Sequence, residues 1–148
     1  MVEIIIKLPY LCKNMEKILI IDDNPVNRKL VSKWLSIYGD CEIAKDGSEA
    51  IQEYHRGIQS GKPYTLFILD LNMGNMSGEE VLVHIRTYEK AFGINKYLPI
   101  IMCSGEKKSK IVMGLFKKGC QHYLVKPIDK QKLNEALSEL KLKPSKLD

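Results

Sequence analysis

Four short apolar runs in this sequence are followed by polar residues whose types suit phosphate and metal chemistry. These residues are Asp22 and Asp23 after residues 18–21, Asp70 after 65–69, Ser104 after 98–103 and Lys126 after 122–125. If the runs are parallel strands of one sheet, their carboxyl ends lie along one edge, where open α/β folds bind ligands. Three carboxylates, a hydroxyl and an amine would then converge on one pocket.

Such a cluster of carboxylates needs positive charge. Two carboxylates about 4 Å apart repel each other by roughly 4 kcal/mol at an effective dielectric of 20. Lys126 supplies one positive charge, and Mg²⁺ suits a site made of carboxylate oxygens and water. Asp70 ends the middle strand and is the candidate nucleophile. Mg²⁺, Lys126 and the Ser104 hydroxyl would stabilise a phosphoryl group in transit. Each residue alone has an ordinary structural reading, as a cap, a loop residue or a surface charge.

The pattern between these runs predicts the elements that position them. Apolar runs at residues 18–21, 41–44, 65–69, 98–103 and 122–125 alternate with amphipathic stretches at 25–38, 48–56, 78–90, 107–117 and 129–140. Strands that alternate with helices predict a parallel sheet covered on both faces, which makes a doubly wound α/β fold. Asn24 and Asp129 are expected N-caps, and Gly39 is expected to end the first helix.

Composition and length indicate one ordinary domain. The chain has 148 residues, is 45% hydrophobic and 28% charged, and carries a net charge of +5. We expect the domain over residues 16–141, an N-terminal extension over 1–15, either disordered or docked, and a tail over 142–148. The lysines are scattered, so no nucleic-acid binding is expected, and no apolar run is long enough to cross a membrane. The four cysteines form no C-x-x-C pair, which favours a reducing, cytoplasmic setting.

The motifs around the polar residues resemble the receiver domains of two-component response regulators and hybrid histidine kinases. The segments that carry the resemblance are Ile18–Asn24, Ala44–Ala50, Leu69–Met73, Ser77–Gly78, Ser104 and Tyr123–Pro127. The likeness covers about residues 16–140. It implies a flavodoxin-like (βα)5 sandwich with a five-stranded parallel sheet in the order 2-1-3-4-5, an order that such receiver proteins illustrate.

The resemblance also implies roles around the acceptor. Asp70 would be the phosphoacceptor and would ligate Mg²⁺ together with Asp23, while Asp22 would help through water. The backbone carbonyl of Asn72 would be a further ligand. The Asn72 side chain would tune how readily water reaches the phosphoryl group.

Further roles follow for the last two strands. Ser104 would hydrogen-bond the phosphoryl oxygen and Lys126 would pair with it, while the Lys126–Pro127 peptide would be cis. Glu106, two residues after Ser104, would help to tune hydrolysis. Ser104 and Tyr123 would form the two-state switch that changes partner binding.

The implied function is a signalling switch in a phosphorelay, catalysing only its own phosphorylation and dephosphorylation. The expected partner is a histidine kinase or a histidine phosphotransfer protein that docks beside the first helix, and the chain is expected to be a monomer. The Asp22–Arg28 opening resembles receivers of hybrid kinases. Two alternatives remain open: a haloacid-dehalogenase-like Mg²⁺-dependent phosphohydrolase, and a flavodoxin-like binding module that is not phosphorylated.

Overall fold

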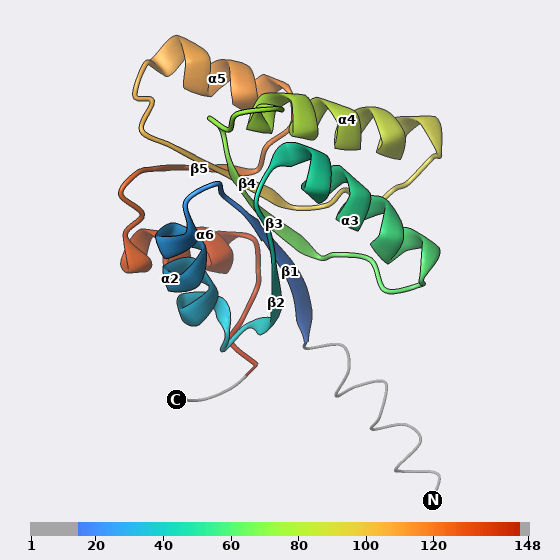
Figure 1. Cartoon of the computed structure of the whole chain (residues 1–148), viewed down its shortest axis with the longest axis horizontal. Coiled ribbons are helices and arrows are strands. Elements are labelled where there is room, and N and C mark those ends of the chain that lie inside the picture. Colours follow the sequence, from blue (N-terminus) through green and yellow to red (C-terminus); the bar gives the residue numbers. More distant parts are fainter. Residues whose placement is uncertain (1–14, 146–148) are drawn as a thin grey trace, which may run out of the picture.

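The computed structural model describes residues 15–145, so the predicted extension, apart from its last residue, and residues 146–148 of the tail lie outside the described residues. The strands are β1 (Glu16–Ile21), β2 (Gly39–Ala44), β3 (Leu66–Asp70), β4 (Ile100–Ser104) and β5 (His122–Val125). The helices are α2 (Pro25–Leu35), α3 (Gly47–Gln59), α4 (Gly78–Ala91), α5 (Ser109–Lys117) and α6 (Lys130–Glu139). The predicted strand–helix alternation is confirmed (Figure 1).

All the strands pair in parallel, in the order β2-β1-β3-β4-β5, which confirms the predicted topology. β3 lies between β1 and β4, with Ile21 opposite Leu69 and Asp70 opposite Cys103. In the next pair, Ser104 lies opposite Val125. The carboxyl ends of β1, β3, β4 and β5 therefore meet along one edge.

Helices cover both faces of the sheet, with α3, α4 and α5 on one face and α2 and α6 on the other (Figure 1). Alternate residues of a strand serve opposite faces: Leu19 and Ile21 pack under α3 and α4, whereas Ile18 and Ile20 pack against α2 and α6. Because successive side chains point to opposite faces and both faces are covered by helices, the central strands are continuous apolar runs in the sequence. Among the described residues, no helix has the length and hydropathy needed to cross a bilayer.

The predicted end of the first helix is wrong. The first helix ends at Leu35 with Ser36 as C-cap, before Tyr38, and Gly39 is the first residue of β2 rather than a helix cap. Glycine is needed there for space, because a Cβ at Gly39 would lie 2.1 Å from the carbonyl oxygen of Glu16. The N-caps at Asn24 and Asp129 are confirmed by side-chain oxygens that accept backbone N–H groups of the following turn.

A buried ion pair fixes the amino-terminal side of β4. Arg86 of α4 lies 2.6 Å from Glu89, and its guanidinium also donates to the carbonyls of Leu98 and Gly119. The other carboxylate oxygen of Glu89 accepts the Leu98 N–H at 2.6 Å. The strand begins at Ile100 instead of the predicted Leu98, because Pro99 has no N–H to give to the sheet.

Candidate phosphoacceptor site

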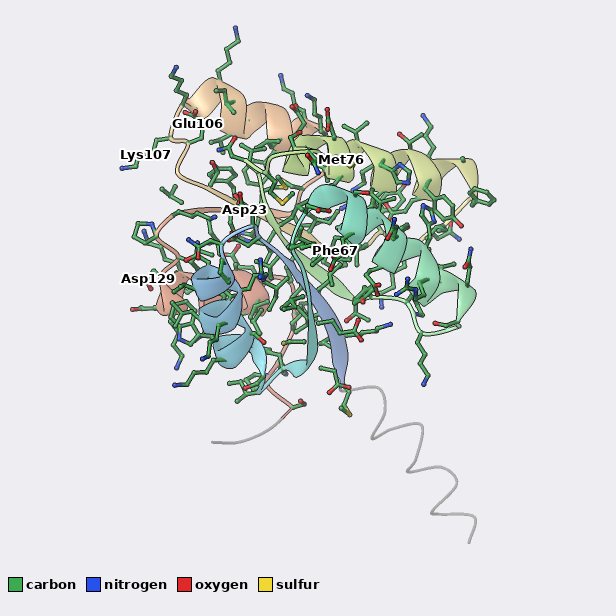
Figure 2. All side chains as sticks on the ribbon, in the orientation of Figure 1. Asp23, Phe67, Met76, Glu106, Lys107 and Asp129 are labelled. Carbon is green, nitrogen blue, oxygen red and sulfur yellow. The ribbon has the colours of Figure 1, made fainter. Side chains whose placement is uncertain are left out.

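The predicted acidic residues converge at the carboxyl edge of the sheet. One carboxylate oxygen from each of Asp22, Asp23 and Asp70 lies within 4.8 Å of the others. Asp22 and Asp70 are buried, at 5% and 4% exposure, whereas Asp23 faces solvent. Figure 2 labels Asp23 in the loop between β1 and α2. The cluster is therefore buried at Asp22 and Asp70 and open to solvent at Asp23.

Lys126 supplies the positive charge inside this cluster. Its Nζ lies 3.0 Å from Asp22 Oδ2 and 3.2 Å from Asp70 Oδ1. Burial alone would lower the pKa of Lys126, but the carboxylates of Asp22 and Asp70 outweigh burial and raise it. The amine therefore stays protonated and bridges the two buried carboxylates. The predicted cis peptide between Lys126 and Pro127 is confirmed.

The surroundings of Asp70, the candidate acceptor, disfavour its ionised form. Burial raises the pKa of Asp70, Lys126 lowers it, and Asp22 raises it again, with a net upward shift. One Lys126 charge does not balance three neighbouring carboxylates. Carboxylate oxygens open to solvent on one side are the donor set that a hard divalent cation prefers, so the residues present fit Mg²⁺.

Ser104 and Asn72 close another side of the site. The Asn72 side-chain amide donates to Ser104 Oγ at 3.1 Å, and the Asn72 backbone N–H donates to Asp70 Oδ1 at 3.3 Å. The turn after β3 therefore folds back over the acceptor. Ser104 Oγ accepts in this bond and in another from Glu106 N at 3.1 Å, which leaves its own hydroxyl proton available as a donor.

Glu106 and Tyr123 lie beside the cluster rather than in it. The Glu106 carboxylate accepts the backbone N–H groups of Lys107 and Lys108, just before α5, where Figure 2 labels Glu106 and Lys107. The half-buried Tyr123 donates its hydroxyl to the Glu106 carbonyl at 2.7 Å. One loop residue thus contacts both predicted switch residues, through its N–H to Ser104 and through its carbonyl to Tyr123.

Two supporting residues have roles that the sequence did not reveal. A Cβ at Gly78 would lie 2.3 Å from the Asp70 carbonyl oxygen, so the start of α4 is pressed against the acceptor strand. The Gly78 N–H donates to the Leu71 carbonyl at 2.8 Å. Arg28 of α2 donates to the Asp22 carbonyl at 2.7 Å. Both residues lie in segments that carry the resemblance, Ser77–Gly78 and Asp22–Arg28, but neither segment predicted the contact that its residue makes.

One cysteine next to the site has an unreactive thiol. Cys103 precedes Ser104 and is 1% exposed. Burial raises the pKa of its thiol to about 12, so it is protonated at neutral pH. A protonated thiol is a poor nucleophile, and Cys103 does not compete with Asp70 for a phosphoryl group.

Comparisons with known proteins agree with this arrangement. The family model described as the response regulator receiver domain matches residues 18–138. Hybrid signal transduction histidine kinase I of Dictyostelium discoideum is 31% identical over 124 residues, which make up 83% of this chain but 7% of that kinase. Chemotaxis protein CheY-3 of Vibrio cholerae is 32% identical over 130 residues, which cover 86% of this chain and 92% of that protein.

A solved structure also superposes closely. It is the receiver domain of the histidine kinase CKI1 from Arabidopsis thaliana, complexed with Mg²⁺ and BeF3⁻. The TM-score is 0.70 at 26% identity, and the match covers 85% of this chain and 89% of that one.

Proposed function

This chain belongs to the response regulator receiver domain family, and on that premise we propose that it takes a phosphoryl group from a phosphohistidine onto Asp70. Members of this family are signalling switches. The observation that carries the assignment is the buried Asp70 carboxylate, with Lys126 Nζ 3.2 Å away and two further carboxylates beside it. Asp70 ends a central strand, and Lys126 and the Asn72 N–H both contact its Oδ1, which leaves Oδ2 as the oxygen to attack phosphorus.

In the proposed transfer, a carboxylate oxygen of Asp70 forms a bond to phosphorus as the bond from phosphorus to the histidine nitrogen breaks. The electron pair of the broken bond stays on the imidazole, which leaves neutral once it is protonated. Lys126 neutralises part of the charge on the phosphoryl oxygens, and the free Ser104 proton can donate to one of them. Lys126 needs little movement, because its Nζ already lies 3.2 Å from Asp70 Oδ1.

We propose that Asp22, Asp23 and Asp70 hold Mg²⁺, with the backbone carbonyl of Asn72 as a further ligand. The carboxylate cluster supports this, and so does the receiver domain of CKI1, which was solved with Mg²⁺ and BeF3⁻. The bound ion would neutralise charge on the phosphoryl oxygens. The chain's own part is to keep Asp23 open to solvent while Lys126 holds the buried pair in place.

Loss of the phosphoryl group belongs to the same proposal. A water molecule attacks phosphorus, the bond to the Asp70 oxygen breaks, and inorganic phosphate leaves. Asn72 is exposed next to the acceptor and can orient that water through its amide. Glu106 affects this step through the loop that it holds.

The proposed partner is a histidine kinase or a histidine phosphotransfer protein that docks beside α2. Val26 and Leu30 of this helix are 71% and 42% exposed, and Ile43 of the neighbouring β2 is 51% exposed. An apolar patch next to Asp23 suits a helical partner that must bring its phosphohistidine over the acidic cluster. Val26→Glu should therefore slow transfer from phosphohistidine and leave labelling by acetyl phosphate unchanged.

Acetyl phosphate with and without Mg²⁺, read by intact mass, tests the acceptor. We expect the mass of one phosphoryl group on the wild type only with Mg²⁺, and none on Asp70→Asn. Asp40→Asn, which changes an exposed aspartate of β2, is the matched control and should label normally. Labelling of Asp70→Asn would refute the assignment. Steady release of phosphate from a small phosphoester would instead favour a phosphohydrolase.

For the output we propose that Ser104, Glu106 and Tyr123 act as one unit. A phosphoryl group on Asp70 draws the Ser104 hydroxyl toward it, and the bond from Glu106 N to Ser104 Oγ transmits that shift to the loop that holds Tyr123. Partner affinity of the phosphorylated wild type and of phosphorylated Ser104→Ala tests the link. An equal affinity gain in both proteins would refute it.

A further inference from the structure

A groove opens at the edge of the sheet opposite the acidic cluster, where β1, β3 and β4 begin. Its volume is about 840 Å³. The start of β1, at the lower end of the sheet in Figure 1, marks its position. Several segments far apart in the sequence supply its apolar lining, chiefly Tyr54, Ile58, Tyr64, Ile94, Leu98 and Leu142. The groove is thus built by the tertiary fold and not by one loop.

The floor of the groove belongs to the core. Tyr54, Tyr64 and Leu98 are only 5%, 6% and 6% exposed. The Leu98 backbone is held in place because its N–H donates to the buried Glu89 carboxylate. At the rim, Tyr97 is 55% exposed, with the Arg86 guanidinium 5.9 Å from the centre of its ring. The groove therefore has a fixed apolar floor and an aromatic side chain at its mouth.

The turn after α6 supplies the wall on the far side. Lys141 has a φ of 64°, the left-handed conformation that often ends a helix. The N–H of Leu142 then donates to the Leu137 carbonyl at 2.9 Å, which sets the course of the chain after the helix. Leu142 lines the groove as a result, while also packing on the core.

The charges around the groove balance. Two acidic and two basic side chains line it, Glu16, Glu89, Lys96 and Lys141. A balanced lining gives little attraction to a strongly charged partner, whereas a fixed apolar floor gains from covering by apolar side chains. The groove therefore suits an apolar segment.

The chain contains such a segment next to the groove. Met15 is part of the lining and is 48% exposed, so the residues that precede it in the chain start at the groove. Residues 4–8, with the sequence Ile-Ile-Ile-Lys-Leu, include four apolar side chains and a single charge. The connecting residues 9–14 span at most about 22 Å when fully extended. This length lets the segment fold back over the groove, and a short connection of this kind gives it a high effective concentration there.

We propose that Ile4–Leu8 of this chain lies in the groove, with the isoleucine side chains against its apolar floor. The extension would then cover the edge of the sheet opposite the phosphoacceptor and form part of the receiver domain. Two other occupants compete with it. One is the same segment of a second copy, and the other is a small apolar ligand, since the volume is within the range of about 300–1,000 Å³ typical of ligand pockets.

Backbone amide NMR spectra of the full chain test the proposal from the side of the segment. The variant combines Ile4→Ser, Ile5→Ser and Ile6→Ser, which removes the apolar side chains without touching the described fold. We expect the amide resonances of Ile94, Tyr97 and Leu98 to shift relative to the wild type. Those of Asp23 and Ser104, at the opposite edge, should stay in place.

Lys13→Ser is the matched control, because it changes the extension and keeps the isoleucines. It should leave the amides of Ile94, Tyr97 and Leu98 where they are in the wild type. Identical spectra for the wild type and the triple variant at these amides would overturn the proposal. Equal shifts in the triple variant and in Lys13→Ser would overturn it as well.

Hydrogen exchange of residues 4–8, read by mass spectrometry, tests it from the side of the groove. We expect exchange to be slower in the wild type than in Tyr97→Asp by roughly tenfold, because a charge at the mouth opposes docking. Tyr97 is exposed enough for the change to be tolerated, and far-UV circular dichroism checks the fold. Equal exchange in the two proteins would refute the docking. Protection that appears only at high protein concentration would assign the groove to a second copy, and a small ligand retained in native mass spectra of the wild type would assign it to that ligand; either result overturns the proposal.

Discussion

Replacing Asp70 with asparagine should make the metal-free protein more stable, even though it removes the proposed phosphoacceptor. The Lys126 ammonium, 3.2 Å from Asp70, attracts it by about 5 kcal/mol at an effective dielectric of 20. The Asp22 carboxylate, within 4.8 Å, repels it by about 3.5 kcal/mol, and the exposed Asp23 adds about 1 kcal/mol at the dielectric of water. These charge effects nearly cancel, so the cost of burying the Asp70 charge decides the sign.

The direction of the Asp70 pKa gives the pH dependence. The native pKa lies above the ordinary value near 3.8, so the folded state binds this proton more tightly than the unfolded state does. The contribution of Asp70 to stability is therefore lost as pH rises through the native pKa, and the cost of the buried charge is fully present above that pKa. Asp70→Asn removes this ionisation. We expect it to raise the free energy of unfolding at pH near 7 without metal, because the folded state no longer carries the buried charge.

Urea unfolding of the wild type and Asp70→Asn, in EDTA and in millimolar Mg²⁺, measures the cost of the buried charge and the stabilisation by the bound ion. An ion at ten times its dissociation constant stabilises the folded state by about 1.4 kcal/mol, so Mg²⁺ should stabilise the wild type and narrow or reverse the difference. Asp40→Asn, on the exposed part of β2, should stay within about 0.5 kcal/mol of wild type. If Asp70→Asn is less stable than wild type in EDTA, the ion pair with Lys126 outweighs burial and the reasoning fails.

Other changes test the scaffold around the site. Arg86→Met should lower the free energy of unfolding in urea by about 3–5 kcal/mol, because it leaves the buried Glu89 carboxylate without its partner. Arg56→Met, at the surface ion pair with Glu53, is the control and should lower it by at most about 1 kcal/mol. Similar losses of stability in the two variants would contradict the argument. Gly78→Ala should lower the free energy of unfolding by about 1–3 kcal/mol and slow labelling by acetyl phosphate, because the new Cβ would press on the acceptor strand. Gly114→Ala is the control: it has open space around its Cβ and should stabilise α5 by up to about 1 kcal/mol. Asn72→Met should lengthen the lifetime of the phosphoryl group by about tenfold, which corresponds to about 1.4 kcal/mol in the barrier to hydrolysis. The lifetime is measured by intact mass, as the phosphoryl mass disappears with time. An unchanged lifetime would mean that another group orients the water.

The sequence predicted the parts of the site that depend on strand ends. Asp70, Ser104 and Lys126 lie at or just after the last residues of parallel strands, and parallel pairing brings such ends together whatever the loops do. The role of Gly39 could not be predicted from strand ends. A glycine after an amphipathic stretch is typical of a helix end, but here the neighbouring chain demands it, and contacts between segments far apart in sequence leave no local pattern.

Glu106 makes contacts inside the site that the sequence did not predict. Its role in tuning hydrolysis stays a prediction, and in the structure its carboxylate accepts the backbone N–H groups just before α5. An acidic side chain next to a helix start competes for such N–H groups. Because the backbone of Glu106 also joins Ser104 to Tyr123, a substitution there changes the loop together with any effect on water. Asn72 donates its amide to Ser104 Oγ, so a substitution there also removes a contact of the switch, and phosphoryl lifetime and partner affinity have to be measured on the same Asn72 variant.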